Sequence, residues 1–159
     1  MNRTLKKILC PIDFTERSLH ALRAAYALAL CFSANLITVY VMPGPQSFRM
    51  PASRPAHHRI MDAYFSEQLD LTVQQWTAGN VPVESMLLEG YAADEIVKVA
   101  DRLHVDAIVM AEEVKTDWER VRDGSTLDEV AIQAPCPVYI LRENDDSGMR
   151  GGQGIIRLS

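Results

Sequence analysis

The sequence predicts an α/β fold: an open five-stranded parallel sheet, doubly wound, with helices on both faces in a three-layer α/β/α sandwich. Short apolar segments rich in β-branched residues alternate with segments whose apolar residues recur about every 3.6 positions. The strand-like segments are apolar almost throughout, which is typical of parallel strands covered on both faces. Strand–helix alternation of this kind favours right-handed crossovers.

The predicted elements follow one another regularly. Strands are expected at residues 6–13, 35–42, 81–88, 106–110 and 137–141. A first helix begins near Thr15, with either Asp13 or Thr15 as its cap, because both side chains accept hydrogen bonds from backbone N–H groups. Further helices are expected over 61–76, around 96–103 and over 124–133. The helix over 61–76 is expected to stop at Gly79 and Asn80.

The length of 159 residues predicts one domain, which we place at residues 1–142. Residues 43–58 contain four prolines and no acidic residue, and we expect a mobile loop there. Residues 143–159 hold four of the eight glycines and form a C-terminal tail. Within that tail, residues 155–158 are expected either to add an edge strand or to dock on a partner.

The composition excludes several classes of protein. A hydrophobic share of 48% and a charged share of 23% are those of an ordinary globular protein. No apolar run approaches the roughly 20 residues of a membrane span. The net charge of −5, without a concentrated basic patch, argues against nucleic acid. Cys10, Cys31 and Cys136 form no metal-ligand pattern and are expected to be buried, reduced thiols in a cytoplasmic protein.

The predicted fold places a ligand crevice. In open parallel sheets ligands bind outside the carboxyl ends of the strands, where the strand order reverses. If the reversal separates the first and fourth strands, Asp13 and Met110 flank one crevice. Residues 111–125 then form its wall.

Three motifs resemble the universal stress protein family over residues 5–142. Residues 11–22 resemble its Pro-x-Asp-x-Ser/Thr-x-x-Ser-x-x-Ala-Leu pattern, and residues 89–96 its Glu-Gly-x-Pro-Ala-x-x-Ile, with Ala92 in place of proline. Residues 124–138 are similar to its most specific signature, Gly-Ser-x-x-x-x-Val followed by Ala-Pro-Cys-Pro-Val. The resemblance implies an adenine nucleotide α-hydrolase-like fold and a role in the stress response.

Nucleotide-binding members of that family carry Gly-x-x-Gly, nine residues, then Gly-Ser/Thr after the fourth strand. Here Ala111 and Val114 replace the first two glycines, and Gly124 keeps the third. Glycine lets backbone N–H groups approach a phosphate, whereas a left-handed conformation costs other residues roughly 1–2 kcal/mol. Residues 111–123 also carry five acids against three basic residues. Both features predict weakened or lost ATP binding.

The resemblance implies a set of nucleotide-binding residues, if a nucleotide binds at all. The position of Asp13 contacts the adenine in relatives, and that of Val41 offers its backbone. Asp13 can equally be only a helix cap, Gly90 a tight turn and Ser125 an N-cap. The full set is Pro11, Asp13, Val41, Gly90, Met110, Gly124, Ser125 and Thr126.

Two functional hypotheses follow. The first is a cytoplasmic, dimeric universal stress protein that acts through protein contacts and has no certain cofactor and no metal. The alternative is a nucleotide-dependent switch that binds ATP or AMP with Mg, in which Lys115, Arg120 or Arg122 folds inward. The resemblance implies a homodimer through the fifth strand, at Val138, Tyr139, Ile140 and Leu141.

No catalytic pattern is evident, so we do not expect an enzyme. A receiver-type phosphoacceptor at Asp13 would need an acidic cluster there and a lysine after the fifth strand, where the chain has Arg142. A flavodoxin-like carrier would need a phosphate cradle, and residues 14–18 make a poor one.

Overall fold

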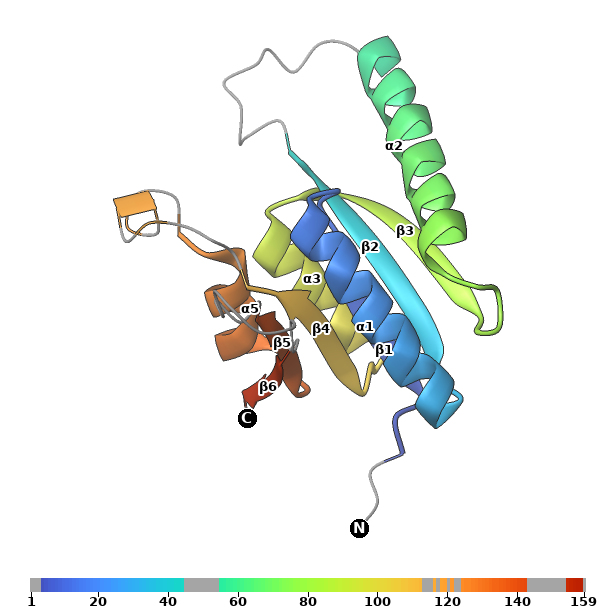
Figure 1. The fold of residues 1–159 in the computed structure, drawn as a ribbon. Coiled ribbons are helices and arrows are strands. Elements are labelled where there is room, and N and C mark those ends of the chain that lie inside the picture. The colour runs from blue at the N-terminus through green and yellow to red at the C-terminus, as the bar shows by residue number, and fades with distance from the viewer. Residues whose placement is uncertain are drawn as a thin grey trace, which may run out of the picture.

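The computed structural model describes residues 4–44, 55–112, 116, 118–119, 121, 124–142 and 154–158, with backbone alone at 55–58 and 154–158. A six-stranded sheet has the order β3-β2-β1-β4-β5-β6 (Figure 1). Its parallel strands are β1 (Lys7–Pro11), β2 (Asn35–Pro43), β3 (Val83–Gly90), β4 (Ala107–Ala111) and β5 (Val138–Arg142). The predicted five-stranded parallel sheet is therefore confirmed.

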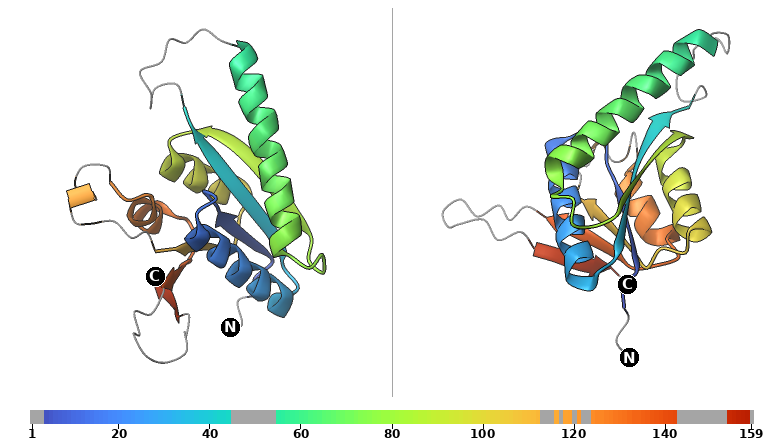
Figure 2. Two further views of the ribbon diagram at one scale, coloured as in Figure 1. Left: turned by 45° about the horizontal axis from the view of Figure 1, so that its top comes forward. Right: turned by 90° about the vertical axis from the view of Figure 1, so that its right-hand side faces the viewer.

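In the described part of the chain, four helices cover the two faces of the sheet. On one face lie α1 (Glu16–Phe32) and α2 (Pro55–Trp76), and on the other α3 (Ala92–Arg102) and α5 (Thr126–Gln133), as Figure 2 shows. Each face has its own apolar core. Leu22 and Leu69 pack in the first core, and Ile96 and Val130 in the second, all nearly inaccessible to solvent. The strands between them are buried on both sides, as their apolar sequences require.

Local capping fixes the start and end of α1. The hydroxyl of Thr15 accepts the N–H of Ser18, so Thr15 and not Asp13 is the N-cap. At the other end Ser33 adopts a left-handed conformation with φ 53°, and the N–H of Ala34 donates to the carbonyl of Ala29 at 2.9 Å. The first helix is thus placed directly after the carboxyl end of β1.

A sixth strand, β6 (Gly154–Leu158), runs antiparallel to β5 at the edge of the sheet. Of the two expectations for residues 155–158, the structure bears out the edge strand. The rest of the tail, at 143–153 and 159, lies outside the described residues. Residues 45–54 of the loop predicted at 43–58 also lie outside the described residues. The first residue of that loop, Pro43, belongs to β2, and its last four residues belong to α2.

The prediction of three buried thiols is wrong for one of them. Cys10 is buried and Cys136 is half-buried, but Cys31 is exposed, because it lies on the outer side of the last turn of α1. Burial raises the pKa of the Cys10 thiol and, with the nearby charge of Asp106, that of Cys136 to about 11. None of the described helices is long and apolar enough to cross a membrane.

Candidate functional site

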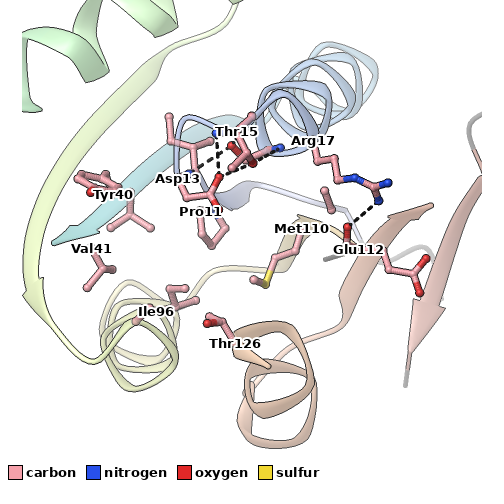
Figure 3. Close-up of a pocket in the computed structure, with 15 residues that line it drawn as sticks. Pro11, Asp13, Thr15, Arg17, Tyr40, Val41, Ile96, Met110, Glu112 and Thr126 are labelled. Carbon is pink, nitrogen blue, oxygen red and sulfur yellow. Dashed lines mark hydrogen bonds between the residues drawn. The ribbon is translucent and has the colours of Figure 1, made fainter. Parts of the chain in front are cut away.

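A cavity of about 440 Å³ opens at the carboxyl ends of β1 and β4, where the strand order reverses. Asp13 and Met110 both line it, as the sequence predicted for a crevice between the first and fourth strands. Figure 3 shows the lining residues converging from the strand ends and from α1, α3 and α5. They are Pro11, Ile12, Asp13, Thr15, Arg17, Ser18, Val39, Tyr40, Val41, Ala92, Ile96, Met110, Ala111, Glu112 and Thr126.

The loop from β1 to α1 is held by its own polar groups. One carboxylate oxygen of Asp13 accepts the N–H and the hydroxyl of Thr15, and the N–H of Asp13 donates to the hydroxyl of Ser18 at 3.2 Å. Phe14 between them has φ 63°, in the left-handed region. The second carboxylate oxygen of Asp13 has no hydrogen bond within the described part of the chain. Asp13 therefore braces the loop and still offers an acceptor to the cavity.

An aromatic cluster adjoins one side of the cavity. The ring of Tyr40 on β2 lies 4.9 Å from that of Phe14 and 4.9 Å from that of Phe65 on α2, measured between centroids. Burial and the negative charge of Asp13 raise the pKa of Tyr40. The wall next to Asp13 is thus apolar and aromatic, which suits a flat ring better than a phosphate.

The opposite side of the cavity carries the guanidinium of Arg17, which donates a hydrogen bond to the protein's own backbone. Arg17 on α1 donates from Nη1 to the backbone carbonyl of Glu112 at 3.1 Å (Figure 3). The carboxylate of Glu112 lies 3.5 Å from Nε of Arg142 on β5. These side chains are 33% and 47% exposed, so their ion pair adds little stability. The contacts nevertheless place a carboxylate directly after β4.

The N-terminus of α5 carries acidic side chains. The hydroxyl of Ser125 caps the helix by accepting the N–H of Asp128 at 3.3 Å. A Cβ atom at Gly124, which has φ 70°, would lie 3.2 Å from a carboxylate oxygen of Glu129. That same oxygen accepts the hydroxyl of Tyr91 at 2.7 Å, and this hydrogen bond raises the pKa of Tyr91. Glu129 thus folds back to the turn where a helix N-terminus would otherwise favour an anion.

Five of the eight candidate binding residues come together at the cavity: Pro11, Asp13, Val41, Met110 and Thr126. Gly90, Gly124 and Ser125 are also described but are not among its lining residues. Gly90 has φ 147°, a backbone conformation that favours glycine, and a Cβ atom there would lie 3.0 Å from Cγ of Glu95. Ala111 lines the cavity, whereas Val114 lies outside the described residues.

The structure adds lining residues that the sequence did not single out, chiefly Arg17 and Tyr40. Arg17 lies four residues after Asp13, and Tyr40 directly precedes Val41. Closeness in sequence to a predicted site residue is therefore the signal that could have identified both. Trp118 is 71% exposed and does not line the cavity. Across the described ranges, no three His, Cys, Asp or Glu side chains are placed to hold a metal ion.

The family model of the universal stress proteins matches residues 4–142. The chain belongs to the universal stress protein family. A universal stress protein of Methanocaldococcus jannaschii is 31% identical over 140 residues, which cover 87% of this chain and 82% of the relative. The sequence resemblance over the three motifs is therefore confirmed.

Solved structures of the universal stress protein family share the fold. One, in complex with cAMP, superimposes with a TM-score of 0.70 at 23% identity and covers 86% of this chain and 97% of its own. Another, from Archaeoglobus fulgidus in complex with dAMP, gives a TM-score of 0.61 at 23% identity, covering 86% and 96%. At these identities the likeness supports the shared architecture alone.

Proposed function

We propose that this universal stress protein acts through protein contacts in the stress response and that its ATP binding is weakened or lost. The observation that carries the proposal is the position of two carboxylates. Glu112 follows β4 directly, and Glu129 folds back onto the first turn of α5. A polyphosphate laid from the crevice toward that helix would approach the carboxylate of Glu129, while the carboxylate of Glu112 lies beside Arg142.

Electrostatics supports this reading. A carboxylate and a phosphate about 4 Å apart repel by about 1–4 kcal/mol before ionic screening. The cation of the cavity wall, Arg17, donates to a backbone carbonyl. Ala111 in place of glycine adds a side chain to the cavity lining. Each of these features lowers the affinity for a triphosphate.

A second candidate is a switch that binds an adenine nucleotide with one phosphate. The cavity volume of about 440 Å³ lies within the usual range for small ligands. Its aromatic side and the acceptor oxygen of Asp13 suit a purine, and two structural neighbours were solved with cAMP and dAMP. Thr126, which lines the cavity at the first turn of α5, would be the group nearest a single phosphate.

Isothermal titration with ATP–Mg, AMP and cAMP separates the two candidates. The leading proposal predicts flat heats, or binding weaker than about 1 mM, for ATP–Mg. The switch predicts AMP binding that Asp13→Ala abolishes. Asp101→Ala is the matched control, because Asp101 is an exposed acid on α3 outside the cavity. Micromolar ATP binding in the unmodified chain would contradict the leading proposal.

We further propose that the protein has no enzymatic activity and resides in the cytoplasm. The support for the first point is the lining of the cavity: among the described residues that line it, Asp13 and Glu112 are the only carboxylates and no histidine or cysteine occurs. A phosphate-release assay with ATP tests the first point, and steady turnover would contradict it. Cell fractionation tests the second.

Self-association through β5 belongs to the same proposal. In the structure β6 pairs with the edge of β5 that faces away from β4. A contact between two copies through that edge therefore requires β6 to separate from β5. Size-exclusion chromatography with light scattering measures the oligomeric state.

A further inference from the structure

Helix α2 is the least buried helix in the described part of the chain. Of its side chains at 59–76, only Leu69 is buried. The amino-terminal end of α2 extends past the carboxyl end of β2 (Figure 1 and Figure 2). A hollow of about 460 Å³ separates α2 from the ends of β2 and β3, with Asp62 and Ser66 on the helix side and Met42 on the strand side. Most of the surface of α2 is therefore left uncovered by the described residues.

Large apolar side chains form a row along the exposed side of this helix. Ile60, Tyr64 and Leu71 are 69%, 53% and 50% exposed. With the exposed Glu67 they recur at intervals of four, three and four residues, which places all of them on one side of the helix. We call these four residues the α2 stripe. Alternating intervals of four and three are the pattern along which one helix packs lengthwise on another.

The charge on the α2 stripe indicates which helix would fit it. Glu67 lies within the apolar row, between Tyr64 and Leu71, and Asp70 is exposed directly before Leu71. Across the described ranges neither carboxylate forms an ion pair. A purely apolar partner would bury Glu67 without compensation, whereas a lysine or arginine opposite it would pair with the carboxylate. The surface therefore favours a helix that is both amphipathic and basic.

Two other occupants suit these side chains less well. A two-fold contact between the α2 stripes of two copies would bring the two Glu67 side chains within about one helical turn of each other, where like charges repel. Helices that lie on membranes are rich in lysine and arginine on their polar face. Over residues 59–76 the chain has one arginine and no lysine, against Asp62, Glu67 and Asp70.

We infer that the α2 stripe is a docking surface for a basic amphipathic helix of a partner protein. This inference rests on the proposed action through protein contacts and names the surface that makes them. The partner's apolar side chains cover Ile60, Tyr64 and Leu71, and one of its lysines or arginines lies opposite Glu67. Tyr64 is the aromatic anchor, since buried aromatic side chains are among the largest contributors to binding at interfaces.

Two synthetic peptides serve as defined probes of this surface. One has leucine on one face of a helix and lysine on the other, and the second has glutamate in place of every lysine. A length of about 20 residues favours helix formation. Fluorescence anisotropy measures the binding of each labelled peptide to the full chain. The lysine peptide is expected to bind with micromolar affinity, and the glutamate peptide at least about 10-fold more weakly. Equal binding of both, or no saturable binding of the lysine peptide, overturns the inference.

Tyr64→Gln combined with Leu71→Gln tests the apolar part of the α2 stripe. Both side chains are at least half exposed, so the fold is expected to persist, and circular dichroism checks it. The affinity for the lysine peptide is expected to fall at least about 10-fold. Ile132→Gln is the matched control, because Ile132 is 84% exposed on α5, and this variant should bind as the unmodified chain does. Unchanged affinity in the double variant overturns the inference.

Glu67→Lys tests the charge within the α2 stripe. The variant is expected to prefer the glutamate peptide over the lysine peptide. Asp101→Lys makes the same change of net charge at an exposed position on α3 and should keep the original preference. An inverted preference in both variants would mean that net charge alone decides binding, and an unchanged preference in Glu67→Lys would mean that the peptide binds elsewhere. Either result overturns the inference.

The docking surface and the proposed loss of ATP binding fail separately. Peptide binding is measured without nucleotide, and ATP–Mg is titrated without peptide. Micromolar ATP binding alongside the expected peptide results would contradict the loss of ATP binding and leave the docking surface intact. Light scattering tests the remaining occupant, a second copy. An oligomer that dissociates in the variant with Tyr64→Gln and Leu71→Gln would assign the α2 stripe to self-association and overturn the inference.

Discussion

Arg17 on α1 donates a hydrogen bond to the backbone carbonyl of Glu112, 3.1 Å away on the far side of the β1–β4 crevice. This hydrogen bond joins the first turn of α1 to the residue that directly follows β4. The Glu112 carboxylate in turn lies beside Arg142. A cation that could meet a phosphate is thus directed at the protein's own backbone.

We predict that Glu129→Gln raises the affinity for AMP by about 3–10-fold, because it removes a negative charge from the first turn of α5. Titration calorimetry measures the change. Asp128→Asn is the control, since it removes one charge from the same turn at an exposed side chain. Equal gains in both variants would mean that net charge matters and the position of Glu129 does not.

Asp13→Ala is expected to destabilise the fold by about 1 kcal/mol, because the loop before α1 loses the acceptor for the N–H and hydroxyl of Thr15. Asp13→Asn keeps an acceptor oxygen and should lose clearly less. Urea unfolding followed by circular dichroism compares the two. If both variants lose the same free energy of unfolding, the charge of Asp13 and not its acceptor supports the loop.

Truncation in the α1-side core should be costly. Leu22→Ala is expected to lower the free energy of unfolding by about 2–5 kcal/mol, because Leu22 is 0% exposed. Leu30→Ala on the same helix, where the side chain is 44% exposed, should cost less than about 1 kcal/mol. Thermal or urea unfolding gives both values. Similar losses would contradict the assignment of the buried face of α1.

The three thiols should differ in their reaction with Ellman's reagent. Cys31 is exposed and is expected to react first. Half-buried Cys136, with its pKa raised to about 11, has about 100-fold less thiolate than an ordinary thiol and should react slowly. Cys10 should react only after unfolding. Loss of the fast phase in Cys31→Ser checks the assignment, and a persisting fast phase would contradict it.

The raised pKa of Cys136 also predicts a pH dependence of stability. The unfolded state releases this proton near its ordinary value of 9.0, whereas the folded state holds it until about 11. The unfolded state therefore binds fewer protons in this interval, so stability falls as the pH rises from 9 to 11. Urea midpoints across this range should fall less in Cys136→Ser. Equal slopes in the two proteins would argue against the shift.

The sequence was sufficient for the parallel sheet and for the meeting of Asp13 with Met110. Both follow from local rules, because apolar β-branched runs mark strands and the strand order fixes where their ends meet. The sequence left Asp13 and Thr15 as alternative caps of α1, and the hydrogen bond from the N–H of Ser18 to the hydroxyl of Thr15 decides for Thr15. Such features depend on neighbours in sequence.

The remaining features depend on contacts between distant segments. Tyr91 and Glu129 meet because α3 and α5 pack side by side, and nothing in either local sequence indicates that hydrogen bond. Arg17 reaches Glu112 across the strand-order reversal for the same kind of reason. The antiparallel pairing of β6 with β5 was only one of two expectations for the tail, because a short apolar segment can pair with its own sheet or dock on another chain.

Native mass spectrometry of the chain, purified from cells without added nucleotide and then incubated with ATP–Mg, tests the central claim most directly. The carboxylates of Glu112 and Glu129 predict a spectrum dominated by the ligand-free mass. A stoichiometric adduct of ATP that Asp13→Ala removes would contradict the account.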